Sequence, residues 1–216
     1  MSDFLYPFLE REEVDVPALL ADLADSARAK AADSAGLRVA TVEREGSRID
    51  AVAGELAERF AAGGRLFTFG NGGSSTDAAS VAALFATPPW GRPLPARCLV
   101  DDTAVLTALG NDVGFDLVFS RQLIAHARDG DMALGLSTSG NSRNLLPAFR
   151  EARQRGVLTV GLAGYDGGEM GRADDVAWCL VVRSDSVHRI QETQGALAFT
   201  LWSAVQERLD RGDGDG

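Results

Sequence analysis

The sequence predicts an α/β protein: a three-layer αβα sandwich around a five-stranded parallel sheet, preceded by two N-terminal helices. Two observations lead to this prediction. Short apolar runs alternate with helical patterns over residues 65–209, and such alternation is typical of a parallel sheet with helices on both faces. The run Val157–Leu162 is apolar throughout, as expected for a strand that is buried on both faces.

No linker interrupts this alternation, so residues 17–210 are predicted to form a single domain. An N-terminal arm at residues 1–16 mixes aromatic and acidic side chains, and the sequence leaves open whether the arm packs on a partner subunit or frays. Residues 211–216 form a polar Gly-Asp tail that is predicted to be disordered. The 216 residues, 45% of them hydrophobic, suffice for one globular core.

The two N-terminal helices are expected at residues 17–35 and 39–60, where apolar residues recur at helical spacing. Pro17 suits the first position of a helix. Amphipathic helices need a partner for their apolar faces. Either the same helices of other subunits cover them in a bundle, or they pack on their own sheet.

Each later strand is expected where a short apolar run is bounded by Gly, Pro or polar residues, and each helix where apolar positions lie three and four apart. The expected strands are residues 65–69, 96–100, 132–136, 157–162 and 176–182. The expected helices are residues 77–86, 104–109, 115–127, 145–155 and 187–209.

Composition restricts the possible partners and the compartment. With a net charge of −10, the chain has no electrostatic footprint for nucleic acid or for an anionic membrane. No apolar run approaches the ~20 residues that span a bilayer, and the first ten residues lack the features of a signal peptide. A cytoplasmic protein is therefore expected. Cys98 and Cys179 each lie in an apolar run, which favours buried, reduced thiols over a disulfide.

A Gly-rich turn follows the first expected strand, with the sequence Gly70-Asn71-Gly72-Gly73-Ser74-Ser75-Thr76. Glycine lets the backbone bend sharply and approach a ligand closely. The serines and the threonine bring hydroxyls to the N-terminus of a helix, where partial positive charge favours an anion. Taken alone, the pattern also fits an ordinary capped turn between a strand and a helix.

A second turn repeats this pattern after the third expected strand, with the sequence Ser137-Thr138-Ser139-Gly140-Asn141-Ser142. Turns at the carboxyl ends of adjacent parallel strands converge on one crevice. Their combined hydroxyls predict a phosphate site that needs no Lys or Arg. Neither turn fits the P-loop or the dinucleotide-binding pattern, so the ligand is predicted to be a monophosphate rather than a nucleotide.

Asp102 follows the second expected strand and therefore faces the same edge of the sheet. Its carboxylate is placed to accept hydrogen bonds from sugar hydroxyls. Asp is also a common N-cap, so a cap on the helix at residues 104–109 is a further role, compatible with the first.

Four motifs in order resemble the sugar isomerase (SIS) domain family, and within it the phosphoheptose isomerase subgroup. They are Gly70-Asn71-Gly72-Gly73-Ser74, Gly110-Asn111-Asp112, Ser137-Thr138-Ser139-Gly140-Asn141-Ser142 and Arg189-Ile190-Gln191-Glu192. The similarity covers residues 19–209. The segment Tyr165-Asp166-Gly167-Gly168 also resembles a member of the subgroup that binds the bacterial replication initiator instead of turning over sugar.

The resemblance implies a homotetramer built around the N-terminal helices, with sites between subunits. It implies that the substrate phosphate is held by Ser74, Ser137, Ser139 and Ser142, together with N–H groups of the second turn, which includes Thr138. It also implies that Asn71, Gly72, Gly73, Asp102 and Gln191 line the sugar.

The catalytic residues of that family do not match. The family's isomerases bind zinc and transfer a proton through a His and a Glu on the helix after the first turn, and through a His on the last helix. Those positions hold Ser80, Leu84 and Phe199 here. Leu and Phe can neither bind zinc nor transfer a proton, and Gln191 alone cannot hold the ion. No cofactor is therefore expected.

Three hypotheses follow. The first is a sugar-phosphate-binding protein without isomerase chemistry that acts as a sensor or regulator, with a possible protein partner. The second is an aldose–ketose isomerase with a rearranged, metal-free site that uses His188 or Glu192. Glu192 adjoins Gln191, however, so the two are not expected on one face of a helix. The third is a scaffold that binds only proteins.

Overall fold

The computed structural model describes residues 16–214, so the predicted arm before Val16 and the last two residues of the predicted tail lie outside the described residues. The chain divides into two compact units, Met1–Gly36 and Leu37–Gly216. The described part of the first unit is entirely helical. It exposes Val16, Leu20 and Leu23.

Helix α1 (Val16–Ala61) is one continuous helix where two were predicted. Gly36 lies inside it, and a glycine in a helix costs only about 1 kcal/mol relative to Ala. No proline follows, and the neighbouring Ala35, Leu37 and Arg38 favour helix, so the helix propagates through the expected break. In the second unit α1 buries the face from Ile49 to Phe60, as the periodicity predicted.

The sheet has five parallel strands, as predicted. They are β1 (Leu66–Gly70), β2 (Ala96–Cys98), β3 (Met132–Ser137), β4 (Leu158–Gly164) and β5 (Trp178–Val182). Their order is β2-β1-β3-β4-β5, so the chain leaves β1 in one direction and returns on its other side at β3. The carboxyl ends of β1 and β3 are neighbours, because Gly70 pairs with Leu136. Ligands of open parallel sheets bind at such a reversal of strand order.

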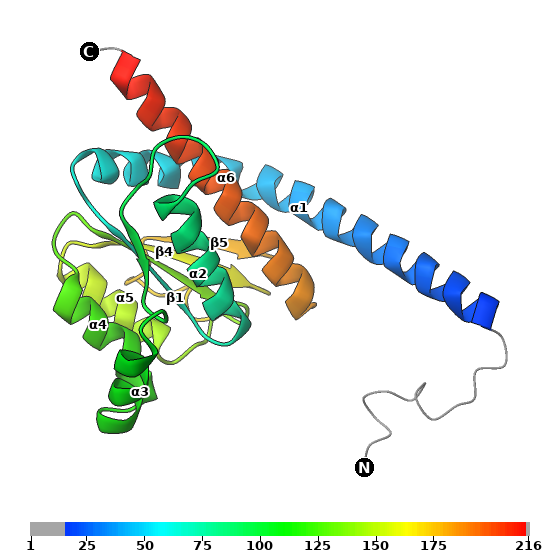
Figure 1. The fold of residues 1–216 in the computed structure, drawn as a ribbon, viewed down its shortest axis with the longest axis horizontal. Helices are drawn as coiled ribbons and strands as arrows, with labels where there is room; N and C mark the ends of the chain where they lie inside the picture. The colour runs from blue at the N-terminus through cyan, green and yellow to red at the C-terminus, as the bar shows by residue number, and fades with distance from the viewer. Residues whose placement is uncertain (1–15, 215–216) are drawn as a thin grey trace. The chain divides into compact units, whose positions relative to one another are not determined.

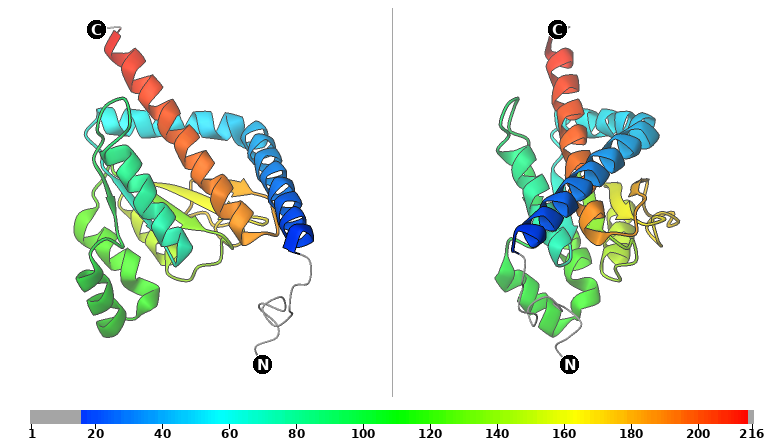
Figure 2. Two further views of the ribbon diagram at one scale, coloured as in Figure 1. Left: turned by 45° about the vertical axis from the view of Figure 1, so that its right-hand side comes forward. Right: turned by 90° about the vertical axis from the view of Figure 1, so that its right-hand side faces the viewer.

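Helices cover both faces of the sheet, which confirms the three-layer arrangement (Figures 1 and 2). On one face, α2 (Gly73–Ala86) and α6 (Val187–Gly214) lie side by side and share a core with residues 49–60 of α1. On the other face lie α4 (Val118–His126) and α5 (Leu145–Gln154). A short helix α3 (Thr103–Asp112) and a 3-10 turn (Phe115–Leu117) precede α4.

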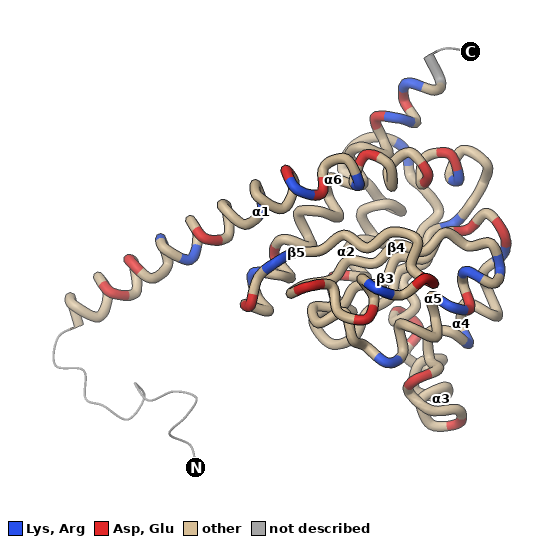
Figure 3. The backbone as a smooth tube through the Cα atoms, turned by 180° about the vertical axis from the view of Figure 1, so that it is seen from behind, with Lys and Arg blue, Asp and Glu red and all other residues tan. Residues whose placement is uncertain are grey.

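Helix α6 continues to Gly214, so residues 211–214 are helical where a disordered tail was predicted to begin at Arg211. Acidic and basic positions are interspersed along the described helices, and no single basic face is evident from this side (Figure 3). Within residues 16–214, no helix combines the length and apolar character of a membrane span. Cys98 and Cys179 are free and buried, as predicted.

Candidate functional site

The two predicted turns meet at one edge of the sheet. The side-chain amides of Asn71 and Asn144 form a reciprocal pair: Asn71 Nδ2 donates to Asn144 Oδ1 at 2.7 Å, and Asn144 Nδ2 donates to Asn71 Oδ1 at 2.9 Å. Asn71 lies in the first turn, and Asn144 directly precedes α5 after the second. An amide can satisfy both bonds at once because it carries a donor and an acceptor. The pair therefore fastens one turn to the other.

The first turn enters α2 four residues earlier than predicted, at Gly73 instead of Asp77. Ser74, Ser75 and Thr76 therefore lie in the first helical turn, where backbone N–H groups have no partner within the helix. Ser74 is buried, and Ser75 Oγ donates to the carbonyl of Gly72 at 2.6 Å. The N-terminus of α2 therefore lies at the carboxyl end of β1, and helix N-termini favour anions.

The second turn gathers its hydroxyls into a small cluster. Ser137 Oγ and Ser142 Oγ are 2.9 Å apart, and Ser137 Oγ also accepts the N–H of Gly140 at 3.1 Å. Ser139 Oγ accepts the N–H of Asn141 at 3.2 Å. These bonds hold three of the predicted phosphate ligands around one bend, with Thr138 between them in the chain. Helix α5 starts at Leu145, as predicted.

A loop after β4 braces the second turn, which the sequence analysis did not anticipate. The N–H of Glu169 donates to Asn141 Oδ1 at 2.8 Å, and the N–H of Met170 donates to the Gly140 carbonyl at 2.9 Å. Gly140 has a φ of +67° and lies so close to the Gly167 carbonyl that no side chain would fit. Tyr165 at the start of the loop has a φ of +52°, which is uncommon for a residue with a side chain.

Asp102 and Gln191 lie beside the turns, where the sequence placed them. Asp102 caps α3, because its Oδ1 accepts the N–H of Val105 at 3.0 Å. Gln191, near the start of α6, lies against Gly73, where an added methyl group would collide with its amide. Helix α6 therefore brings Gln191 to the first turn, as the predicted site requires.

A cavity of about 420 Å³ opens beside Gln191. It is lined by Asp77, His188, Gln191, Glu192 and Gly195. Glu192 and Gln191 thus line one cavity, contrary to the expectation that adjacent residues lie on different faces of a helix. Glu192 also forms an ion pair with Arg189.

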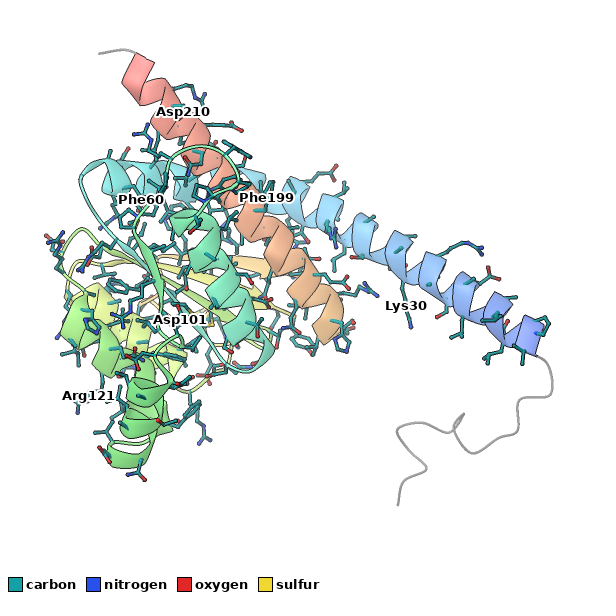
Figure 4. All side chains as sticks on the ribbon, viewed as in Figure 1. Lys30, Phe60, Asp101, Arg121, Phe199 and Asp210 are labelled. Atoms are coloured by element: carbon teal, nitrogen blue, oxygen red, sulfur yellow. The ribbon has the colours of Figure 1, made fainter. Side chains whose placement is uncertain are left out.

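The residues at the family's catalytic positions do not fit a zinc ion. Ser80 Oγ donates to the Thr76 carbonyl within its own helix at 2.9 Å. Leu84 offers no ligand atom. Phe199 lies on α6 (Figure 4) and packs against Trp202, with ring centroids 5.2 Å apart. Among residues 16–214 no three His, Cys, Asp or Glu side chains are grouped as metal ligands.

Asp77 is a site residue that the sequence analysis missed. Gln191 Nε2 donates to Asp77 Oδ2 at 3.2 Å. Asp77 also lines a second, smaller cavity of about 90 Å³, shared with Ser80, Val81, Leu84, Leu136, Gly195 and Ala198. Burial raises the pKa of the Asp77 carboxyl, and the hydrogen bond from Gln191 partly opposes that rise. The sequence signal that could have identified Asp77 is an acidic residue one helical turn before Ser80.

Two hydroxyl-bearing turns that meet at the carboxyl edge of a parallel α/β sheet are the arrangement expected for a SIS-type protein. A family model described as "SIS domain" matches residues 31–164. The chain belongs to the SIS domain family.

Relatives within this family are named phosphoheptose isomerase. The chain is 47% identical to the one from Sulfurimonas denitrificans over 147 residues, which cover 67% of this chain and 74% of that protein. It is 39% identical to the one from Aquifex aeolicus over 179 residues, 82% of this chain and 93% of that protein. A solved structure, phosphoheptose isomerase GmhA from Neisseria gonorrhoeae, superposes with a TM-score of 0.79 at 33% identity, covering 86% of this chain and 99% of that chain.

Proposed function

We propose that the protein binds a sugar phosphate at the paired turns, with the phosphate at the second turn and the sugar beside Asn71, Asp102 and Gln191. The observation that supports this most strongly is the reciprocal amide pair of Asn71 and Asn144, which holds both hydroxyl-bearing turns at one cleft. Hydrogen bonds to a charged group contribute about 1.5–3 kcal/mol each. Several of them account for micromolar affinity, about −8 kcal/mol, without a basic side chain.

We further propose that the protein interconverts aldose and ketose forms of its ligand, and that it does so without zinc. The names of the relatives at 39–47% identity support isomerisation. The side chains of Ser80, Leu84 and Phe199 argue against a zinc centre, so the proton must move through other groups. The same three side chains favour a second candidate, a sensor or regulator that binds the sugar phosphate without turnover.

Two measurements separate these functions. A thermal-shift screen of three- to seven-carbon sugar phosphates, with inorganic phosphate as reference and with or without zinc, tests binding. Incorporation of solvent deuterium into sedoheptulose 7-phosphate and the shorter sugar phosphates tests isomerisation. Binding with exchange supports the isomerase, and binding without exchange supports the sensor. A melting temperature that no sugar phosphate raises would exclude both and favour a protein-binding scaffold.

The assembly and compartment belong to the same proposal. We expect a cytoplasmic protein, and a homotetramer, as the family resemblance implies, would use the N-terminal helices as its core and place sites between subunits. The exposed apolar side chains Leu20 and Leu23 on α1 are consistent with such a bundle. Light scattering coupled to size-exclusion chromatography tests it, and a monomer at micromolar concentration would contradict it.

A further inference from the structure

Asp77 occupies a distinctive place in the site. It is the ionisable side chain that lines both the 420 Å³ cavity beside Gln191 and the 90 Å³ cavity beside Leu84. The larger cavity also contains the imidazole of His188. The smaller one has mostly aliphatic walls, including Val81 and Ala198. A carboxylate at the junction of an open polar space and an apolar recess is positioned to meet a bound ligand.

Helix geometry directs Asp77 to this junction. Ser80 follows it by three residues and Leu84 by seven, so all three side chains lie on one face of α2. The family's proton-transferring groups are absent from the second and third of these positions. Asp77 supplies a carboxylate on the same helix face, nearer to the Gly-rich turn at its start.

The hydrogen bond from Gln191 fixes this carboxylate. An ionised carboxylate only accepts hydrogen bonds, so the NH₂ group of Gln191 must face Asp77 Oδ2. Asp77 is partly exposed and lines both cavities. One carboxylate oxygen is thus held by Gln191, while the residue stays accessible to a ligand.

Burial provides supporting chemistry. It raises the pKa of the Asp77 carboxyl above the ordinary value, and a raised pKa makes the carboxylate a stronger base. The hydrogen bond from Gln191 partly opposes this rise in the pKa, because it stabilises the charged form.

We propose that Asp77 is the catalytic base of a metal-free aldose–ketose isomerisation in this cleft. The assignment rests on the proposed isomerase function and names the residue that removes the proton from carbon. His188, which lines the same cavity, exchanges protons with the sugar oxygens.

In the aldose-to-ketose direction, the Asp77 carboxylate takes the proton from C2. The electron pair of the C2–H bond forms the C1=C2 double bond, and O1 takes a proton from the His188 imidazolium to give the enediol. Neutral His188 then removes the O2 proton while the C2=O bond forms, and the C1=C2 electrons take the proton of the Asp77 carboxyl at C1. Both side chains return to their starting protonation states, and no oxidant or reductant is needed.

The test compares Asp77→Asn with the full-length parent protein. Deuterium incorporation into sedoheptulose 7-phosphate is measured by mass spectrometry, and the dissociation constant by calorimetry. Removing a positioned base costs about 10²–10⁴-fold, so exchange should fall at least about a hundredfold while the dissociation constant stays within a few fold. Asp174→Asn is the matched control: it removes the same charge from an exposed carboxylate and should leave both values unchanged.

A rescue experiment distinguishes a base from a structural residue. Asp77→Ala should lose exchange and regain part of it in added formate or acetate, which no packing role would produce. Exchange that Asp77→Asn leaves intact would overturn the assignment, as would a parent protein that binds sugar phosphates but exchanges no proton. Failure of every sugar phosphate to bind the parent would instead overturn the proposed function, and the assignment with it.

Discussion

The two halves of the cleft differ in how closely they keep the family's chemistry. The phosphate half, formed by the turns after β1 and β3, retains its serines and glycines and is tied together by Asn71 and Asn144. The wall formed by α2 and α6 carries Ser80, Leu84 and Phe199 at the three positions where the family resemblance implies polar catalytic groups. Under the proposed function, ligand binding and proton transfer depend on separate sets of side chains, so each set can be perturbed without the other.

The largest effect is expected from Gly140→Ala in the phosphate half. Its φ of +67° disfavours any residue with a Cβ, and that atom would collide with the Gly167 carbonyl. The second turn must then move away from the loop after β4, which costs about 3 kcal/mol in the free energy of unfolding. Urea unfolding measures this loss, and sugar-phosphate binding should disappear with it.

Gly46→Ala provides the control for Gly140→Ala. Gly46 lies inside α1 with no atom near its missing Cβ, so the change should raise stability by about 0.5–1 kcal/mol. Equal destabilisation by both changes would show that the loop after β4 does not hold the second turn.

The next effect concerns the tie between the turns. Asn144→Ala leaves the amide of Asn71 without its two hydrogen bonds, and the buried site cannot replace them easily with water. We expect a loss of about 1–3 kcal/mol in unfolding free energy, together with weaker sugar-phosphate binding. In a double-mutant cycle with Asn71→Ala, a coupling energy near zero would contradict the tie.

A purely local effect is expected for the serines of the second turn. Ser139→Ala and Ser142→Ala each remove one hydroxyl from the phosphate site, and a lost hydrogen bond to a charged group costs about 1.5–3 kcal/mol, or roughly 10–150-fold in affinity. The melting temperature without ligand should hardly change. Ser203→Ala on α6 serves as the control, and unchanged affinity in both serine variants would remove the phosphate assignment.

The sequence allowed the prediction of the sheet and the meeting of the two turns, since both follow from local patterns and from the geometry of parallel strands. It did not predict the continuity of α1, because the expected break at Gly36 carries only a small helix penalty. Likewise, the polar composition after Arg211 suggested disorder, whereas α6 simply extends from a well-packed segment.

The missed site residues share a physical cause. Asn144 and the loop after β4 act through contacts between segments far apart in the chain. The hydrophobic periodicity of a sequence does not indicate such contacts. Asp77 was overlooked because an acidic residue near a helix start has an ordinary explanation in the helix dipole. Its significance depends on the partly buried position opposite Gln191, which only the packing of α6 on α2 creates.

The smallest predicted effect is the pH dependence of stability that comes from the Asp77 carboxyl. The pKa of Asp77 is raised in the folded protein, so between its unfolded value of about 3.8 and its folded value the folded state binds more protons. Asp77 therefore adds stability at low pH that is lost as pH rises through the folded pKa.

Asp77→Asn stays neutral at every pH and still accepts the hydrogen bond from Gln191, so it avoids this loss. At pH 7–8 its melting temperature should exceed that of the parent by at most about 2–4 °C, because solvent screens a partly exposed carboxylate. The difference should vanish below about pH 4. A variant that is less stable than the parent at neutral pH would show that the Asp77 charge serves folding, whereas a rise in stability with a loss of exchange is the behaviour of a residue kept for its chemistry.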